Sequence, residues 1–274
     1  MEALCNHGGD IIKALNVNVY GNGTQTVVLA HGYGSDQTVW HYLIPYIAFY
    51  FKVVVFDLVI AGNVNPKLYD PKRYSDFNGY AQDLVCLLDQ LNVNNTIYVG
   101  HSMSALIGCI AATKRPELFK HLILLSGSPR YLNDKGYTGG FEKSQLNTVF
   151  NQIDKDFSNW VQSFAPIAVT VNSSTAVAEF EGSLGRMRPK IALSAAKTVF
   201  LSDNREVLPH VLVPSFIIQS EKDNIVPKSV AFYMKRNLGG HAKVKILKTE
   251  GHFPQLTATP LVLKVLNKIL HVKT

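Results

Sequence analysis

The sequence has little charge, few cysteines and no long apolar run. Charged residues make up 17% of its 274 residues and hydrophobic residues 47%, which excludes a disordered chain and is enough for one large core or two modest ones. The longest apolar stretch, 42–51, contains Pro45 and is half of the roughly 20 residues that a membrane-spanning helix needs. We therefore expect a globular protein with no membrane partner.

The three cysteines, Cys5, Cys86 and Cys109, are widely spaced and form no CxxC pair. This pattern fits neither a disulfide framework nor a zinc site, so we expect reduced thiols. The N-terminus lacks the basic segment, apolar segment and small-residue cleavage site of a secretory signal. These features predict an intracellular location.

The net charge is +7, and the last 74 residues hold 11 Lys and Arg against 5 Asp and Glu. The excess is scattered: Lys243, Lys245 and Lys248 are typical of the solvated face of a strand, and no aromatic residues are interleaved with them. Net charge alone indicates only non-specific association. No nucleic-acid partner is expected.

Short β-branched runs alternate with helix-like segments along most of the chain. Because several of these runs are apolar nearly throughout, they are typical of strands covered by helices on both faces. The sequence predicts an α/β domain with a mostly parallel central sheet flanked by helices. Expected strands are 26–29, 52–56, 96–99, 121–125, 215–218 and 243–247, and expected helices are 35–48, 79–91, 102–114, 228–237 and 260–270.

One stretch, 133–202, interrupts this alternation. An insertion of helices is typical of a lid over the carboxyl ends of the strands, where open α/β sheets bind ligands. We expect a single core formed by residues 1–132 and 203–274, with the lid 133–202 inserted. The expected lid helices are 142–153, 156–164, 174–184 and 189–201, with loop signals at 164–166 and 188–189.

The most informative motif is Gly100-His101-Ser102-Met103-Ser104, between an expected strand and an expected helix. This is the context of the nucleophile elbow G-x-S-x-G, a tight turn that projects a serine Oγ above the sheet. Ser104 departs from the last glycine of that motif but is small. Ser102 is therefore the candidate nucleophile.

A glycine-rich turn, His31-Gly32-Tyr33-Gly34, follows the first expected strand. Such a turn leaves backbone N–H groups free to face negative charge on a carbonyl oxygen. We assign an oxyanion hole to the N–H groups of Tyr33 and Met103, the residue after the nucleophile. Each motif is weak alone, and together they favour acyl-transfer chemistry.

A serine nucleophile needs a base and a carboxylate, which in this class follow it in the order Asp, then His. Asp223 follows the expected strand 215–218, and His252 follows the expected strand 243–247. Strand-end loops converge at one edge of a parallel sheet, so we expect both residues to lie near Ser102.

Other residues compete for these roles. Glu221 and Glu250 lie near the acid position, and Asp57 follows another expected strand but precedes the elbow in the chain, which is more typical of a structural residue. His101, inside the elbow, is expected to pack or hydrogen-bond locally. No HExxH, P-loop or GxGxxG motif is present, and no metal or cofactor is expected.

These motifs resemble the plant strigolactone esterase and receptor family of the α/β-hydrolase superfamily, with its karrikin-receptor and DWARF-like relatives. Residues 100–108 are similar to the family's GHSxSA(M/L)IG, which includes the serine at position 104, and residues 31–37 with Trp40 are similar to its oxyanion segment. Residues 57–66 are closer to the strigolactone-receptor branch, whereas Met103 and 68–71 resemble DWARF-like paralogues. Further matches are 115–119, 128–134, 139–142, 164–166, 187–189 and 250–256.

The resemblance implies a four-helix V-shaped lid over an apolar pocket and slow hydrolysis of strigolactone-like butenolides. It also implies hormone perception by a monomer, with an F-box protein and repressor proteins docking on the lid surface, in cytoplasm and nucleus. Mapped onto this chain, the pocket candidates are Tyr33, Tyr131, Phe141, Trp160, Phe164, Phe180 and Phe200. For Trp160 and Phe180, packing inside the lid is an equal alternative.

Three hypotheses follow from the sequence. The first is a hydrolase and receptor for a butenolide hormone, and it is favoured by the family resemblance. The second is a general carboxylic-ester hydrolase without a signalling role. The third is a largely non-catalytic regulator that binds butenolides.

Overall fold

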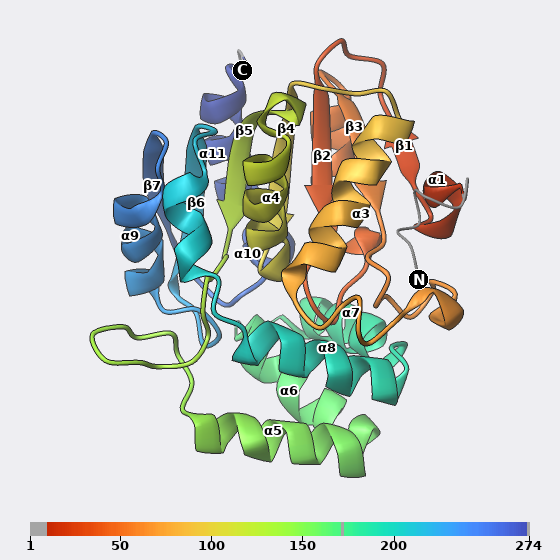
Figure 1. Ribbon diagram of the computed structural model, residues 1–274, viewed down its shortest axis with the longest axis vertical. Coiled ribbons are helices and arrows are strands. Elements are labelled where there is room, and N and C mark those ends of the chain that lie inside the picture. The colour runs from red at the N-terminus through yellow and green to blue at the C-terminus, as the bar shows by residue number, and fades with distance from the viewer. Residues whose placement is uncertain (1–9, 171–172, 273–274) are drawn as a thin grey trace.

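The computed structural model describes residues 10–170 and 173–272. Its seven-stranded sheet has the order β1-β3-β2-β4-β5-β6-β7 (Figure 1). Strands β2 to β7 run parallel, and β1 pairs antiparallel with β3 at the edge. The strands are β1 (Asn18–Tyr20), β2 (Thr26–Ala30), β3 (Lys52–Phe56), β4 (Thr96–His101), β5 (Phe119–Leu125), β6 (Ser215–Lys222) and β7 (Ala242–Glu250).

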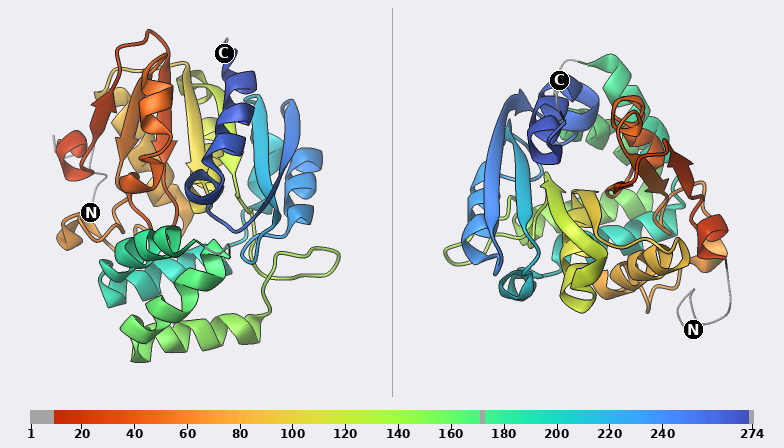
Figure 2. Two further views of the ribbon diagram at one scale, coloured as in Figure 1. Left: turned by 180° about the vertical axis from the view of Figure 1, so that it is seen from behind. Right: turned by 90° about the horizontal axis from the view of Figure 1, so that it is seen from above.

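Helices cover both faces of this sheet (Figures 1 and 2). On one face lie α3 (Phe77–Gln90), α4 (Met103–Lys114) and α9 (Lys228–Asn237), and on the other lie α2 (Ile44–Ala48) and α11 (Thr259–Leu270). Short α1 (Ile11–Ala14) packs against α3, and α10 (Pro254–Thr257) precedes α11. Every residue of β2 and β4 is buried, which is why these strands are largely apolar instead of alternating.

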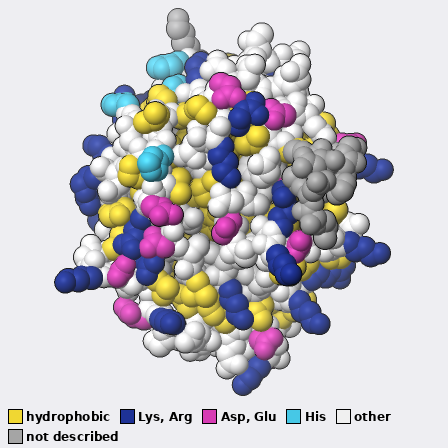
Figure 3. Space-filling view, viewed as in Figure 1, with side chains coloured by type: hydrophobic (Ala, Val, Ile, Leu, Met, Phe, Trp, Pro, Cys, Tyr) yellow, Lys and Arg dark blue, Asp and Glu magenta, His cyan; other side chains and the backbone are white. Residues whose placement is uncertain are grey.

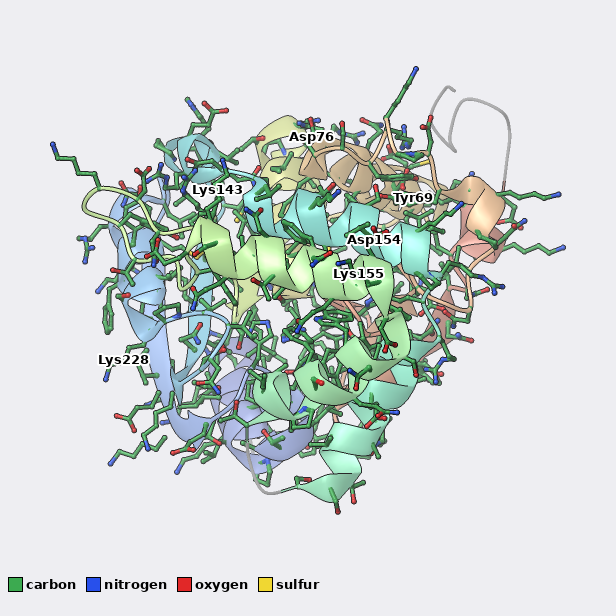
Figure 4. All side chains as sticks on the ribbon, turned by 90° about the horizontal axis from the view of Figure 1, so that it is seen from below. Tyr69, Asp76, Lys143, Asp154, Lys155 and Lys228 are labelled. Carbon is green, nitrogen blue, oxygen red and sulfur yellow. The ribbon has the colours of Figure 1, made fainter. Side chains whose placement is uncertain are left out.

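Four helices connect β5 to β6 and lie together beyond one end of the sheet (Figure 1). They are α5 (Lys143–Lys155), α6 (Phe157–Val169), α7 (Ser174–Gly185) and α8 (Pro189–Leu201). Figure 4 looks at them from outside, with α5 running between the labelled Lys143 and Lys155 alongside α8. The predicted α/β class with an inserted four-helix lid is confirmed.

The structure corrects three local predictions. The loop expected at 164–166 is wrong, because α6 continues through Pro166 to Val169; burial of Ala165 and Ala168 holds this helix although proline removes one backbone hydrogen bond. The helix expected at 35–48 is broken into a 3-10 turn, Gln37–Trp40, and the short α2, with Pro45 in its first turn. Strand β1 was not predicted, because three exposed residues carry no periodic signal.

The redox state of one cysteine differs from the prediction. Cys86 in α3 is disulfide-bonded, so the prediction of a reduced thiol is wrong there, because wide sequence spacing does not exclude proximity in the fold. Cys109 in α4 is a free buried thiol, and burial raises its pKa to about 12. Cys5 lies outside the described residues. Within the described ranges, no helix is both long and apolar enough to span a bilayer.

Close packing of α4 on the sheet yields the first prediction. A Cβ on Gly108 would lie 2.3 Å from Cε1 of Tyr98, whose hydroxyl donates to the carbonyl of Ser104 and fixes the ring. Gly108→Ala should therefore lower the free energy of unfolding by about 1–3 kcal/mol, measured by urea titration.

The matched control is Gly182→Ala in α7, where the nearest atom would lie at an ordinary 3.7 Å. This change should be neutral or stabilise the protein by up to about 1 kcal/mol, because alanine favours the helix. Equal effects of the two substitutions would contradict the packing argument.

Candidate active site

The topology brings two predicted motifs side by side. Strand β2 lies between β3 and β4, so the turn after β2 and the turn after β4 meet where the strand order reverses, the point at which open α/β sheets bind ligands. A Cβ on Gly32 would lie 2.9 Å from Cβ of Ser102. Only glycine permits this approach of the two turns.

Ser102 has the backbone geometry of a nucleophile elbow. It combines φ +56° with ψ −122° between β4 and α4, a strained conformation for a residue with a side chain. Ser104, the departure from the general motif, is fully buried, and its hydroxyl donates to the carbonyl of His31. The serine at position 104 thus joins the elbow to the turn after β2.

The structure brings Ser102, His252 and Asp223 into one chain of hydrogen bonds. The Oγ of Ser102 lies 2.8 Å from Nε2 of His252, and Nδ1 of His252 lies 2.8 Å from Oδ2 of Asp223. If Nδ1 carries the proton, Nε2 is free to accept the serine proton, as a general base must. The side chain of Asp223 is fully buried and that of His252 is 5% exposed.

Several donors hold the carboxylate of Asp223 in place. The backbone N–H groups of Ile225 and Val226 donate to Oδ1 at 2.8 and 3.1 Å, and Nε2 of Gln219 donates to Oδ2 at 3.0 Å. These bonds satisfy a buried anion and fix its position against His252.

The competing acids lie in other environments. Glu250 forms an ion pair with Lys222, and Glu221 is exposed. Asp57 accepts hydrogen bonds from the side chains of Asn16, Gln37 and Asn63, which makes it the centre of a structural network.

The two N–H groups assigned to an oxyanion hole belong to the two turns that meet at Ser102. Met103 is the first residue of α4, directly after Ser102, and Tyr33 lies in the turn after β2. Within the described ranges, neither N–H donates to a protein acceptor. A buried N–H without a partner is costly, so both are available to an anionic oxygen.

A small cavity lies over Ser102 and His252. Its volume is about 20 Å³, room for little more than one water molecule. Of the predicted pocket residues, Tyr33, Tyr131, Phe164, Phe180 and Phe200 line it. Prediction from sequence missed the other lining residues, Ala168, Val199, Ile225 and Phe253, although Phe253 adjoins His252.

Two predicted pocket residues do not line this cavity. Phe141 packs edge-on against Phe200 with ring centroids 5.4 Å apart, and Trp160 stacks on Phe164 at 5.0 Å. Both rings support lining residues from behind, which for Trp160 matches the alternative of packing inside the lid. Phe180 lines the cavity and is itself 2% exposed.

Tyr131 adds a contact that was not anticipated. Its hydroxyl lies 3.2 Å from Oγ of Ser102, and burial raises its pKa well above the ordinary value. When the serine proton is directed to Nε2 of His252, the Tyr131 hydroxyl is the group left to donate in this pair. The resting nucleophile therefore has a second partner.

Two further histidines beside the site are held neutral. Burial lowers the pKa of His31, outweighing the nearby Asp57, and the Nε2 of His31 accepts a bond from the N–H of Leu58. Burial and the neighbouring His252 lower the pKa of His101. Its Nε2 donates to the carbonyl of His252 at 2.8 Å, which confirms the expected local role of His101.

These histidines predict a loss of stability in mild acid. Below about pH 6.5 the unfolded chain binds protons that the folded site excludes, so stability falls as the pH falls, and above that pH their contribution is constant. We expect a loss of about 1 kcal/mol per pH unit for each histidine, measured by urea unfolding at pH 7.5 and 5.5.

A variant tests the assignment. His101→Asn keeps an N–H donor but does not titrate, so its stability should depend less on pH in this window. Asp36 does not affect stability in this pH window. Burial alone would raise its pKa, but hydrogen bonds from Thr38 and Arg186 outweigh burial and lower it, so its contribution to stability is lost only below about pH 4. A wild-type stability that is flat from pH 7.5 to 5.5 would contradict the buried neutral histidines.

Among the described residues, no group of three or more His, Cys, Asp or Glu side chains is placed to hold a metal ion.

Comparison with known proteins identifies the family. The model of the α/β hydrolase fold matches residues 25–259. A hydrolase from Oleispira antarctica has a similar structure, with a TM-score of 0.92, 33% identity, and coverage of 96% of this chain and 97% of that one.

Two other relatives are more similar to this chain in sequence than that hydrolase is. A strigolactone esterase of Arabidopsis thaliana is 48% identical over 95% of this chain and 98% of its own length. A karrikin insensitive 2 receptor of Petunia hybrida is 47% identical over 96% of this chain and 98% of its own. The chain therefore belongs to the α/β-hydrolase superfamily, within the family that contains the strigolactone esterases and karrikin receptors.

Proposed function

We propose that this protein is a serine hydrolase and hormone receptor that binds and slowly hydrolyses strigolactone-like butenolides. The observation that carries the proposal is the hydrogen-bonded chain of Ser102, His252 and Asp223 beneath an aromatic cavity. The family relationship supports the substrate class, because the relatives are named strigolactone esterases and karrikin receptors.

In the proposed mechanism, Ser102 Oγ attacks the butenolide carbonyl while Nε2 of His252 takes its proton. Asp223 keeps the proton on Nδ1 and stabilises the imidazolium that forms. The N–H groups of Tyr33 and Met103 bind the carbonyl oxygen as it becomes negative. The tetrahedral intermediate collapses with cleavage of the ring C–O bond, and the acyl fragment stays on Ser102. The released ring oxygen becomes an aldehyde as the enol-ether group leaves as a stabilised enolate, which takes the proton from His252.

The second step removes this fragment. Water attacks the acyl carbonyl with His252 as base, or His252 itself receives the fragment before hydrolysis. A slow second step leaves a long-lived covalent state, which suits a sensor better than a metabolic enzyme.

The small cavity indicates that substrate entry requires the lid to move. Sites for drug-sized ligands have volumes of about 300–1,000 Å³, far above the roughly 20 Å³ over Ser102. Two contacts hold the turn at the end of α7 against the turn after β2. Arg186 pairs with the buried carboxylate of Asp36, and the Ser183 hydroxyl donates to the carbonyl of Gly34.

The lid is also bonded to the loops of the base and the acid. The N–H of His252 donates to the carbonyl of Ala168 at 2.9 Å, and the side chain of Asn224, next to Asp223, donates to the carbonyl of Ile167. Both acceptors lie at the end of α6, so a covalent change that moves His252 also displaces hydrogen bonds to the lid. This coupling supports a signalling role.

The remaining parts of the proposal follow the family. The core comprises residues 1–132 and 203–274, the lid comprises 133–202, and an F-box protein and repressor proteins dock on the lid of a monomer in cytoplasm and nucleus. Ligand-dependent binding of an F-box partner separates this function from a general carboxylic-ester hydrolase.

The decisive experiment follows a fluorogenic butenolide with wild type and Ser102→Ala, with intact mass spectrometry on the same samples. Wild type should turn over slowly and carry a small adduct, and Ser102→Ala should lose at least about 10³-fold of the activity, as removal of a triad member does. Equal turnover by both proteins would exclude Ser102 as nucleophile. Absence of turnover and adduct in wild type would favour the non-catalytic regulator.

Removal of the ion pair between Arg186 and Asp36 should let a small reagent reach Ser102 faster. A sulfonyl fluoride should label Ser102 up to about fivefold faster in Arg186→Ala, because such a pair contributes up to about 1 kcal/mol to the closed lid. The control is Arg188→Ala, an exposed residue two positions along that has no ion-pair partner within the described ranges. Equal labelling rates in the two variants would exclude the pair as a restraint on opening.

A further inference from the structure

A second and larger hollow lies between strands β6 and β7 and helix α11. Its volume is about 570 Å³, within the range of small-molecule sites. It shares no lining residue with the cavity over Ser102. Residues of α11 line it, and this helix covers one face of the sheet (Figure 2). We call it the basic groove, for the residues described below.

The floor of the basic groove is apolar. Phe216 and Ile218 alternate along β6 and therefore share one face of the sheet, while Val265 and Ile269 are four residues apart and share one face of α11. Phe216 is half-buried, and Leu261 at the start of α11 is 38% exposed. The helix thus leaves part of this apolar surface open.

The rim of the groove is cationic on both sides. Lys243 and Lys245 of β7 are the register partners of the two floor residues of β6, so they project on the same face. Across the groove, Lys264 and Lys268 are four residues apart on α11. The ammonium of Lys243 lies 5.9 Å from the ring centre of Phe216.

The positive charge of the groove is not balanced locally. Five lysines and His271 line it, and no Asp or Glu does. None of these lysines forms an ion pair with a carboxylate of the described ranges. On the face of the molecule in Figure 3, by contrast, Lys and Arg are interspersed with Asp and Glu. Lys243, Lys245 and Lys248 are exposed, as predicted for the solvated face of a strand, and they also line this groove.

We propose that the basic groove binds a single-chain fatty carboxylate, with its alkyl tail on the apolar floor and its carboxylate between the lysines of β7 and α11. Burial of the tail supplies affinity in proportion to apolar area, and ammonium groups form charge-assisted hydrogen bonds with a carboxylate. A concave floor accommodates one tail, whereas a membrane surface offers nothing to fill the hollow. This site goes beyond the proposed hydrolase function.

The test is calorimetric titration of laurate, below its micellar concentration, into wild type and Lys243→Glu/Lys245→Glu. We expect one saturable site in wild type and at least tenfold weaker binding in this variant. The matched control, Lys228→Glu/Lys235→Glu on α9, makes the same charge change on the opposite face of the sheet and should bind like wild type. Lys243→Arg/Lys245→Arg should retain binding. Circular dichroism verifies that each variant is folded.

Two further ligands distinguish the alternatives. Dodecanol, with the same chain and no charge, should bind at least tenfold more weakly than laurate. The proposal is overturned if laurate shows no saturable binding, or if both charge-reversal variants weaken it equally. It is also overturned if only phosphatidylglycerol vesicles bind in a manner that depends on Lys243 and Lys245, because the groove would then face a membrane.

Discussion

The strained backbone at Ser102 is the constraint on which the site depends. A residue with a side chain at φ +56° persists only where its surroundings enforce it. Here the buried β4 enters the turn and the buried first residues of α4 leave it, and the turn at Gly32 packs so close that a Cβ there would lie 2.9 Å from Cβ of Ser102. The same turn directs Oγ toward His252 and the Met103 N–H away from any protein acceptor in the described part of the chain.

Burial then decides the protonation states around that turn. His31 and His101 are excluded from water and held neutral, so each has one donor and one acceptor nitrogen. His101 uses its donor to hold the backbone of His252, and Asp223 holds the ring. The base is thus oriented from two sides, which reduces the reorganisation needed when it accepts a proton.

The lid both closes the site above Ser102 and forms hydrogen bonds with the loops that carry His252 and Asp223. Aromatic rings from α6, α7 and α8 fill the space over Ser102 and leave only a small cavity. Hydrogen bonds connect backbone carbonyls at the end of α6 to the loops of His252 and Asp223. Under the proposed function, a ligand that enters has to separate these rings, and a covalent change at His252 would act on α6 through these hydrogen bonds.

The sequence by itself determined the parallel sheet, the lid, and the identity of Ser102, Asp223 and His252 as candidates, because apolar strands, a tight small-residue turn and strand-end polar residues are local patterns. Only the tertiary structure distinguished Asp223 from Asp57, added Val199 and Phe253 to the cavity lining, and continued α6 through Pro166. It alone paired Cys86 and placed lysines of β7 opposite those of α11. Those outcomes depend on contacts between distant segments, which local periodicity does not encode.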